Sequence, residues 1–459
     1  MPAARRASRR PSSDRAPSRP RARGLALLAL AAGLVVAGGA RAQSLPELLA
    51  AARAYDASYL AVRAQTDSAP YRAAQAAALK RPSAGLSASA TAGRVDPPNF
   101  AALSSNGATL ALSGRQALFN RASDATIAQA ERQVEAARLE LQGAEQDLII
   151  RVAQAYFDVL GAQDTLATTR AAKAQISEQL ASAKRNFEVG TATITDTREA
   201  QARFDLATAQ EIAAENDLRS KRVALDQLVG RSGVAPLPLA VPVALPAVEP
   251  ADIERWVATA DDGHPSIRRA RIGLDVARLE TDKARAGSLP TVDAVASIGD
   301  SYAAGRAAQL NGTRGSTRSA SIGVQMSLPL YTGGSVQNRV QETLLLEERA
   351  RNDLEAARRG VGQATRTAYL GVQSGQAQVK ALEAAEASSQ LALEATQVGY
   401  RVGVRVNVDV LNAQTQLFQT RRDLAQARYN VLLGGLRLRQ AAGVLTPDDV
   451  AAIDPLFRR

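Results

Sequence analysis

The chain has 459 residues, no cysteine, one histidine and a formal net charge of +11. Without cysteine there can be no disulfide, thiol nucleophile, zinc–cysteine cluster or lipid-modified N-terminal cysteine, and one histidine leaves little room for acid–base catalysis or a histidine-rich metal site. The net charge would suit a nucleic-acid-binding protein, so the location of that charge has to be established first.

Residues 1–42 have the pattern of a cleaved export signal. Eight arginines precede an apolar run from Gly24 to Gly39, which is too short for a comfortable membrane span, and Ala40-Arg41-Ala42 has the form of a cleavage site. This segment carries a charge of +8, whereas the remainder carries only +3. The predicted mature chain is therefore nearly neutral, and no nucleic-acid partner is expected. The alternative for this segment is a disordered basic tail with an anchor.

Residues 43–233 form the first of two predicted repeats. A short helix precedes a β-hairpin near residues 84–119, in which apolar residues alternate with polar ones or glycine. A long helix is predicted over 123–187, because large apolar residues recur every seven positions with alanine three positions later. At about 1.5 Å per residue it would be about 100 Å long, too long for a compact globule. After a break at Gly190, a further helix is predicted over 195–229.

A proline-rich linker, residues 234–250, separates this repeat from a second one over 251–459. The second repeat has the same order: a helix, a hairpin near residues 291–331, a long helix over 335–399 and a helix over 408–441. In its last helix five large apolar residues recur every seven positions, namely Val410, Leu417, Leu424, Val431 and Leu438. Taken alone, these heptads would also fit an ordinary coiled coil.

The two repeats match residue by residue where their long helices end. Phe187-Glu-Val-Gly190 corresponds to Tyr400-Arg-Val-Gly403, and an aspartate follows each glycine by six positions, as Asp196 and Asp409. Joint recurrence of these features is hard to attribute to chance. It predicts the same helix–turn–helix structure twice.

The four alternating segments have the length of membrane-spanning strands, about ten residues each. Phe119 and Tyr331 are expected to end the second and fourth strands, as interfacial aromatic residues often do. Because unpaired edges are not tolerated in lipid, four strands would require further copies of the chain. Two copies would give a filled eight-stranded barrel and three a twelve-stranded barrel with a lumen. Residues 95–107 and 300–316 would be the outer loops. The alternative is two exposed hairpins packed on helices.

At residues 187–196, 327–334, 400–412 and 425–430 the sequence resembles the TolC family of outer-membrane channel-tunnel proteins. The resemblance covers nearly all of residues 43–455. It implies an α+β membrane protein: a homotrimer whose four strands per chain form a twelve-stranded transmembrane β-barrel in the lipid of the cell outer membrane. Helices of the two structural repeats would continue it into the periplasm as a long α-helical coiled-coil barrel.

The function that this resemblance implies is transport rather than catalysis, without cofactor or metal. The chain would be the exit duct of a tripartite efflux pump or a type I secretion system. Its partners would be a periplasmic adaptor (membrane fusion protein) and an inner-membrane ABC or proton-driven transporter. The alternative is a periplasmic adaptor or coiled-coil structural protein of an envelope complex. An adaptor would have one helical hairpin in a single β-rich body, not a duplicated arrangement.

The resemblance also assigns roles to residues at the helix breaks. Asp409 would face the pore constriction, where the family pattern has a second carboxylate three residues later and this chain has Asn412. Weaker cation selectivity than in a relative with two acidic rings is therefore expected. Tyr400 would form a gating link to Asp196, and Arg405 would link to Thr195 and its neighbours. For both aspartates the alternative is helix N-capping.

Overall fold

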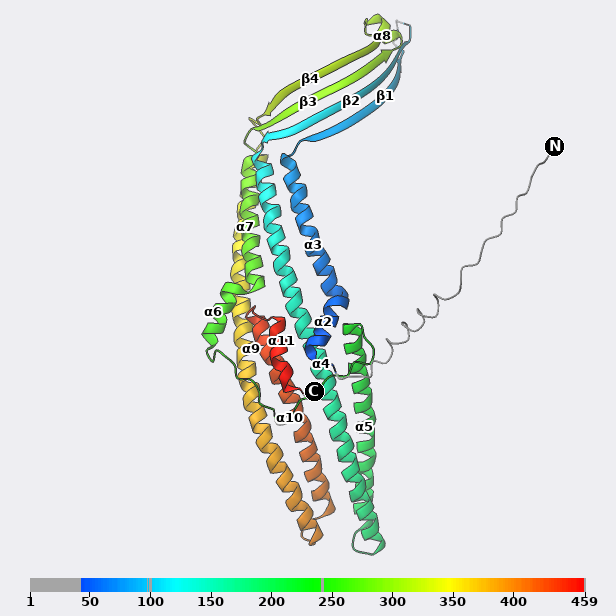
Figure 1. Cartoon of the computed structure of the whole chain (residues 1–459), viewed down its shortest axis with the longest axis vertical. Coiled ribbons are helices and arrows are strands. Elements are labelled where there is room, and N and C mark those ends of the chain that lie inside the picture. The colour runs from blue at the N-terminus through cyan, green and yellow to red at the C-terminus, as the bar shows by residue number, and fades with distance from the viewer. Residues whose placement is uncertain (1–42, 97, 99–100, 241–242, 458–459) are drawn as a thin grey trace, which may run out of the picture. The chain divides into compact units, whose positions relative to one another are not determined.

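A computed structural model of the chain describes residues 43–457, apart from 97, 99–100 and 241–242. The predicted export signal over 1–42 lies outside the described residues and stays a prediction. Within Gln43–Arg459, which forms one compact unit, a β-sheet lies at one end of a set of long helices. The turns between paired long helices lie at the other end (Figure 1).

The first repeat begins with two helices that a capping aspartate separates, and it continues through a β-hairpin into a pair of long helices. Its helices and strands are α2 (Leu45–Tyr55), α3 (Ala57–Ala77), β1 (Ser83–Val95), β2 (Leu103–Phe119), α4 (Arg121–Glu188) and α5 (Ile194–Val229). A single 3-10 turn, Ala78–Lys80, joins α3 to β1. The long helix α4, expected over 123–187, has 68 residues.

The second repeat has the same order and adds short elements at its hairpin and at the end of the chain. Its helices and strands are α6 (Ile253–Gly263), α7 (Pro265–Ala286), β3 (Thr291–Ala304), α8 (Arg306–Leu310), β4 (Gly315–Ser327), α9 (Ser335–Arg401), α10 (Asn407–Ala441) and α11 (Pro447–Ile453), followed by a 3-10 turn, Asp454–Leu456. His264 caps α7, since its Nδ1 accepts a hydrogen bond of 3.1 Å from the Ser266 backbone N–H.

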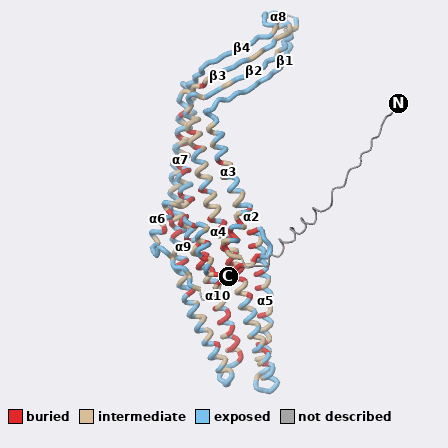
Figure 2. The backbone as a smooth tube through the Cα atoms, viewed as in Figure 1, coloured by how far each residue is buried: buried red, intermediate tan, exposed pale blue. Residues whose placement is uncertain are grey.

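The four strands form one antiparallel sheet in the order β1-β2-β3-β4, so each repeat contributes one hairpin. One face carries apolar residues in register across the strands: Leu86, Leu112, Ile298 and Ala320. The other face is rich in hydroxyl groups, and the Oγ atoms of Ser297 and Ser321 are 2.8 Å apart there. Both faces are largely exposed in the single chain (Figure 2). None of the described helices is long and apolar enough to cross a membrane.

Two details of the hairpins differ from the sequence-based expectation. Phe119 ends β2, but Tyr331 lies four residues beyond the end of β4 at Ser327. Pro329 accounts for this, because proline has no N–H to donate to a strand ladder. The strands also extend into the segments expected to be outer loops: β2 begins at Leu103 and β3 runs to Ala304.

The seam predicted in the last long helix packs as expected. All five large residues of its heptads are at most 4% exposed in α10. Small residues allow α9 to approach closely. A Cβ atom on Gly375 would lie 3.0 Å from a methyl carbon of Val431, and one on Gly434 would lie 3.2 Å from a methyl carbon of Val372. The alternation of large and small residues therefore sets the spacing of α9 and α10.

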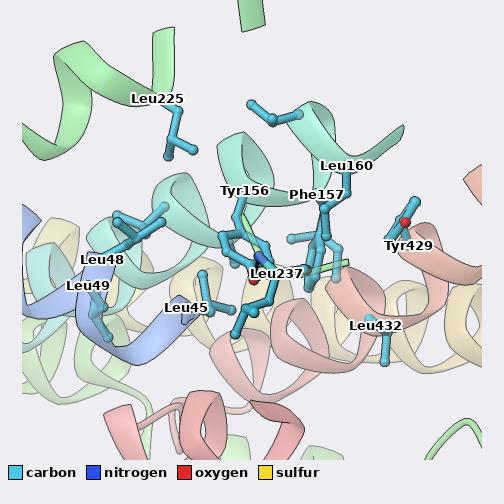
Figure 3. Close-up of a cluster of buried hydrophobic side chains, with 14 of the residues drawn as sticks. Leu45, Leu48, Leu49, Tyr156, Phe157, Leu160, Leu225, Leu237, Tyr429 and Leu432 are labelled. Atoms are coloured by element: carbon cyan, nitrogen blue, oxygen red, sulfur yellow. Dashed lines mark hydrogen bonds between the residues drawn. The ribbon is translucent and has the colours of Figure 1, made fainter. Parts of the chain in front are cut away.

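The largest apolar core, part of which Figure 3 shows, joins α2, α4, α5, α10 and the C-terminal segment. Aromatic rings join these elements. Phe157 of α4 stacks on Tyr429 of α10 and on Phe457, with ring centroids 5.9 and 6.2 Å apart. The Tyr156 hydroxyl donates to the Leu237 carbonyl oxygen and accepts from the Leu237 N–H. The linker and the chain end are thereby fixed to the first repeat.

An ion pair between a buried aspartate and a half-exposed arginine holds the bend between α2 and α3. Both carboxylate oxygens of Asp56 accept hydrogen bonds from Arg151 of α4, at 2.9 and 3.1 Å. Further bonds come from the Ser58 hydroxyl and the Tyr59 N–H. The hydrogen bonds from Arg151 are the main reason that the pKa of Asp56 lies well below its usual value.

Replacing Asp56 by asparagine is expected to lower the thermal unfolding midpoint of the detergent-solubilised protein. Loss of the charge leaves Arg151 without its carboxylate, at a cost of about 1–3 kcal/mol. Because the folded-state pKa is depressed, this stabilisation is present above the unfolded pKa of about 3.9 and is lost as the pH falls further. Unfolding scans should show the full wild-type advantage at pH 7 and a smaller one at pH 3, because pH 3 lies between the unfolded pKa and the depressed folded-state pKa. Asp67→Asn, at an exposed pair with Arg63, is the control.

Candidate functional site

The two turns that join the long helices, α4–α5 and α9–α10, have the same backbone structure. Gly190 and Gly403 adopt positive φ angles of 78° and 80°, which favour glycine. In the first turn the Thr191 N–H donates to the Asn186 carbonyl oxygen at 2.8 Å. The equivalent bond in the second turn, from Val404 to Gly399, is 2.9 Å long. The repeated sequence thus encodes a repeated helix–turn–helix end.

Asp196 caps the N-terminus of α5. Its Oδ2 accepts hydrogen bonds from the backbone N–H and the hydroxyl of Thr193, at 3.0 and 2.7 Å. In return, the Asp196 N–H donates to the Thr193 hydroxyl at 3.2 Å. These reciprocal bonds form a complete capping box, which is the arrangement expected if Asp196 serves to cap the helix rather than to hold a gate. Thr195, the neighbouring residue with an expected gating role, is exposed.

Asp409 occupies the equivalent position in α10 but is held more loosely. Its Oδ2 accepts a long hydrogen bond of 3.4 Å from the Val406 N–H, and valine offers no hydroxyl for the reciprocal bond. Arg405 Nη1 lies 3.6 Å from the same oxygen. About a third of the side chain remains exposed. The carboxylate of Asp409 is therefore freer than that of Asp196 to act on ions.

Tyr400 joins the two turns through a partner that the sequence did not indicate. The Asn186 side-chain N–H donates to the Tyr400 hydroxyl at 3.3 Å. The single chain therefore gives Tyr400 and Arg405 other partners than the expected Asp196 and Thr195: Asn186 for the tyrosine and Asp409 for the arginine. The roles of these four residues as gating links stay a prediction.

Two further polar contacts connect the helical pairs close to the turns. The Gln179 side-chain N–H of α4 donates to the Asn407 side-chain oxygen at the start of α10. Arg203 of α5 donates to the Asn412 Oδ1 at 3.1 Å. The polar atoms of Asn407 include a buried N–H group with no partner among the described residues. Leu411 of α10 also packs with Leu180 and Ala183 of α4 and with Ala200 of α5, so a buried apolar contact joins the two pairs beside these polar ones.

The contacts between α4 and α10 become stronger towards the core. The Tyr429 hydroxyl donates to Asp164 at 2.6 Å, and Arg437 of α10 donates to the Gln154 side-chain oxygen of α4 at 2.8 Å. Burial is the main cause of a raised pKa at Asp164, and it also raises the pKa of Tyr429. Polar contacts thus join the two helical pairs in the middle, and both polar and apolar contacts join them near the turns.

Asn186, Gln179 and Arg203 are the residues that sequence reasoning missed at this site. Only Asn186 carried a usable signal, since it immediately precedes the repeated Phe187 motif. Its equivalent in the second repeat is Gly399, which has no side chain. This difference between the repeats could have identified Asn186 as a candidate residue. Gln179 and Arg203 lie outside the motif and pair across the fold with residues 228 and 209 positions away.

A family model described as "Outer membrane efflux protein" matches residues 37–231 and 256–444, one match for each repeat. The outer membrane protein TolC of Vibrio cholerae is 34% identical over 419 residues, which cover 90% of this chain and 93% of that protein. The alkaline protease secretion protein AprF of Pseudomonas aeruginosa is also 34% identical, over 68% of this chain and 64% of that protein.

Solved structures show the same fold. The outer membrane protein VceC of Vibrio cholerae superimposes with a TM-score of 0.74 over 87% of this chain and 96% of that one, at 22% identity. At that identity the likeness concerns the fold alone.

Proposed function

The chain belongs to the outer membrane efflux protein family, and from this membership we propose that three copies form the exit duct of a tripartite efflux pump or type I secretion system. The chain is an outer-membrane channel protein with its helical part in the periplasm, and it is not an enzyme. Family membership also removes the alternative of a periplasmic adaptor.

The observation that carries the trimer proposal is the two-faced sheet with open edges. Among the described residues, β1 and β4 each pair on one side only. The apolar face lies against nothing in the single chain, and Ile322 in β4 is 90% exposed. In lipid, such edges must pair with those of other copies. Three copies give twelve strands, which enclose a lumen, whereas two would give a filled barrel.

The partners in this proposal are a periplasmic adaptor and an inner-membrane ABC or proton-driven transporter. Relatives named for protease secretion and for efflux both resemble the chain. The partly exposed hydrogen bonds at the helix turns, from Asn186 to Tyr400 and from Arg203 to Asn412, support a duct that opens at this end when a partner binds. Asp409 of each copy would contribute one carboxylate, so that three copies form one acidic ring there.

The proposal predicts that the two faces of β4 respond oppositely to charge. Ile322→Arg should abolish the SDS-resistant, heat-modifiable trimer in outer-membrane fractions, because arginine facing mid-bilayer lipid costs about 2–4 kcal/mol per chain. Ser321→Arg, at the neighbouring position on the hydroxyl-rich face, should leave the trimer intact. Gel electrophoresis with and without boiling provides the readout. Trimer loss only in Ser321→Arg, or a wild-type species of another size, would contradict the proposal.

A further inference from the structure

A small cavity lies between the linker and α10. The linker, α6, α9, α10 and α11 surround a volume of about 180 Å³. Trp256 of α6 and Val431 of α10 line it from one apolar core, and Leu436 and Ile453 line it from the other. The cavity is therefore a gap between two cores, and its walls are largely apolar. Apolar cavities of about 150 Å³ stay dry in water and take up molecules the size of benzene.

The cavity is kept open by the second of two consecutive glycines in α10. A Cβ atom on Gly434 would lie 3.2 Å from a methyl carbon of Val372, so the close approach of α9 accounts for that glycine. Gly435 lines the cavity, and a Cβ atom there would meet no atom within 4 Å. Glycine destabilises a helix interior relative to alanine. No packing contact requires glycine at 435, and a side chain there would fill the cavity.

The mouth of the cavity carries an uncompensated negative charge. Arg439 and Asp449 both line the cavity, but they pair with each other. Glu249 of the linker lines it too and is exposed, and its carboxylate has no ion pair or hydrogen bond among the described residues. Trp256 is only 7% exposed, and its indole N–H already donates to the Pro250 carbonyl oxygen at 2.8 Å. A free carboxylate beside an aromatic wall suits a cation.

We propose that this cavity binds one small organic cation whose body is apolar and about the size of a single aromatic ring. The apolar body fills the gap between the two cores and contacts Trp256. The ammonium group stays at the mouth, where the Glu249 carboxylate and water solvate it. An anion of the same shape is disfavoured by Glu249. The site lies outside the sheet and the helix turns that carry the proposed function, so either proposal can fail while the other holds.

The test uses the fluorescence of Trp256, which is the only tryptophan of the chain. The purified full-length protein is titrated at pH 7 with para-bromobenzylamine, a cation at this pH, whose bromine quenches indole fluorescence on contact. The uncharged probe of matched shape is para-bromobenzyl alcohol. We expect saturable quenching by both, with a dissociation constant about two- to five-fold higher for the alcohol, because a partly exposed ion pair is worth little. Quenching that rises linearly without saturation, or equal constants for the two probes, would overturn the proposal.

Two variants separate the charge of the site from its shape. Glu249→Gln keeps the size of the side chain but removes its charge, so the amine should then bind no more tightly than the alcohol. Gly435→Leu fills the cavity and should abolish saturable quenching by both probes. Gly371→Leu, at an exposed position of α9 where a Cβ atom also meets nothing within 4 Å, is the matched control and should bind both probes as the wild type does.

Either variant can contradict the proposal. Saturable quenching at wild-type affinity in Gly435→Leu would show that the probes do not occupy the cavity. A preference for the amine that survives in Glu249→Gln would show that the carboxylate does not bind the cation. Because Glu249 is exposed, its variant keeps the fold, and it decides the proposal even if Gly435→Leu gives no folded protein.

Discussion

Replacing Tyr400 by phenylalanine together with Arg405 by serine is expected to raise the single-channel conductance several-fold. The change removes the contact between Tyr400 and Asn186, which joins the two turns, and the ion pair between Arg405 and Asp409. The ion pair lies within one turn, so the hydrogen bond between the turns is the contact that opposes opening; it is worth about 0.5–1.5 kcal/mol per copy, hence about 1.5–4.5 kcal/mol in a trimer. That is enough to move a closed population to a largely open one, since about 1.4 kcal/mol is a factor of ten.

The control for this prediction makes the same chemical changes away from the turns. Tyr71 and Arg72 lie on exposed positions of α3, and Tyr71→Phe with Arg72→Ser should leave the conductance unchanged. Planar lipid bilayer recordings at fixed salt give the readout. Equal conductance in wild type and in the Tyr400/Arg405 variant would contradict the gating role of the turns.

Asp409→Ala is expected to bring the cation-to-anion permeability ratio close to that of an unselective pore. Three symmetry-related carboxylates at a constriction favour cations, and alanine removes all of them. Block by polyvalent cations from the periplasmic side should weaken in parallel. Reversal potentials in a salt gradient measure the ratio. Asp423→Ala, further along α10 and paired with Arg422, should leave it unchanged. An unchanged ratio in Asp409→Ala would show that Asp409 does not face the pore.

The opposite change tests the missing second ring. Asn412→Asp would add a carboxylate, but the Arg203 side chain that now donates to Asn412 would neutralise part of it. We therefore expect little gain in selectivity from Asn412→Asp alone. With Arg203→Gln added, cation selectivity and polyvalent-cation block should exceed those of the wild type.

Much of the fold could be predicted because it repeats and because its periods are simple. The heptads of α10 marked residues that prove to be buried, and the period-two pattern separated the two faces of the sheet. The match between Phe187 and Tyr400 located both turns. Each of these signals is local, so a single sequence is enough to show it.

Contacts between distant segments could not be predicted in the same way. Tyr429 was part of a family-like motif, but nothing local linked it to Asp164, 265 residues away. Likewise, the partners of Tyr400 and Arg405 depend on how the helical pairs sit side by side. Tyr331 was misplaced because an alternating pattern was followed through Pro329, where the ladder of hydrogen bonds ends.

The most direct test of the duct is a bilayer recording of the wild-type trimer, purified from outer membranes without heating. We predict discrete, cation-preferring steps of low conductance from the trimeric fraction and none from the same sample after boiling. A correctly inserted, heat-modifiable trimer that conducts no ions, even with the Tyr400 and Arg405 substitutions in place, would contradict a continuous passage through three copies of this chain.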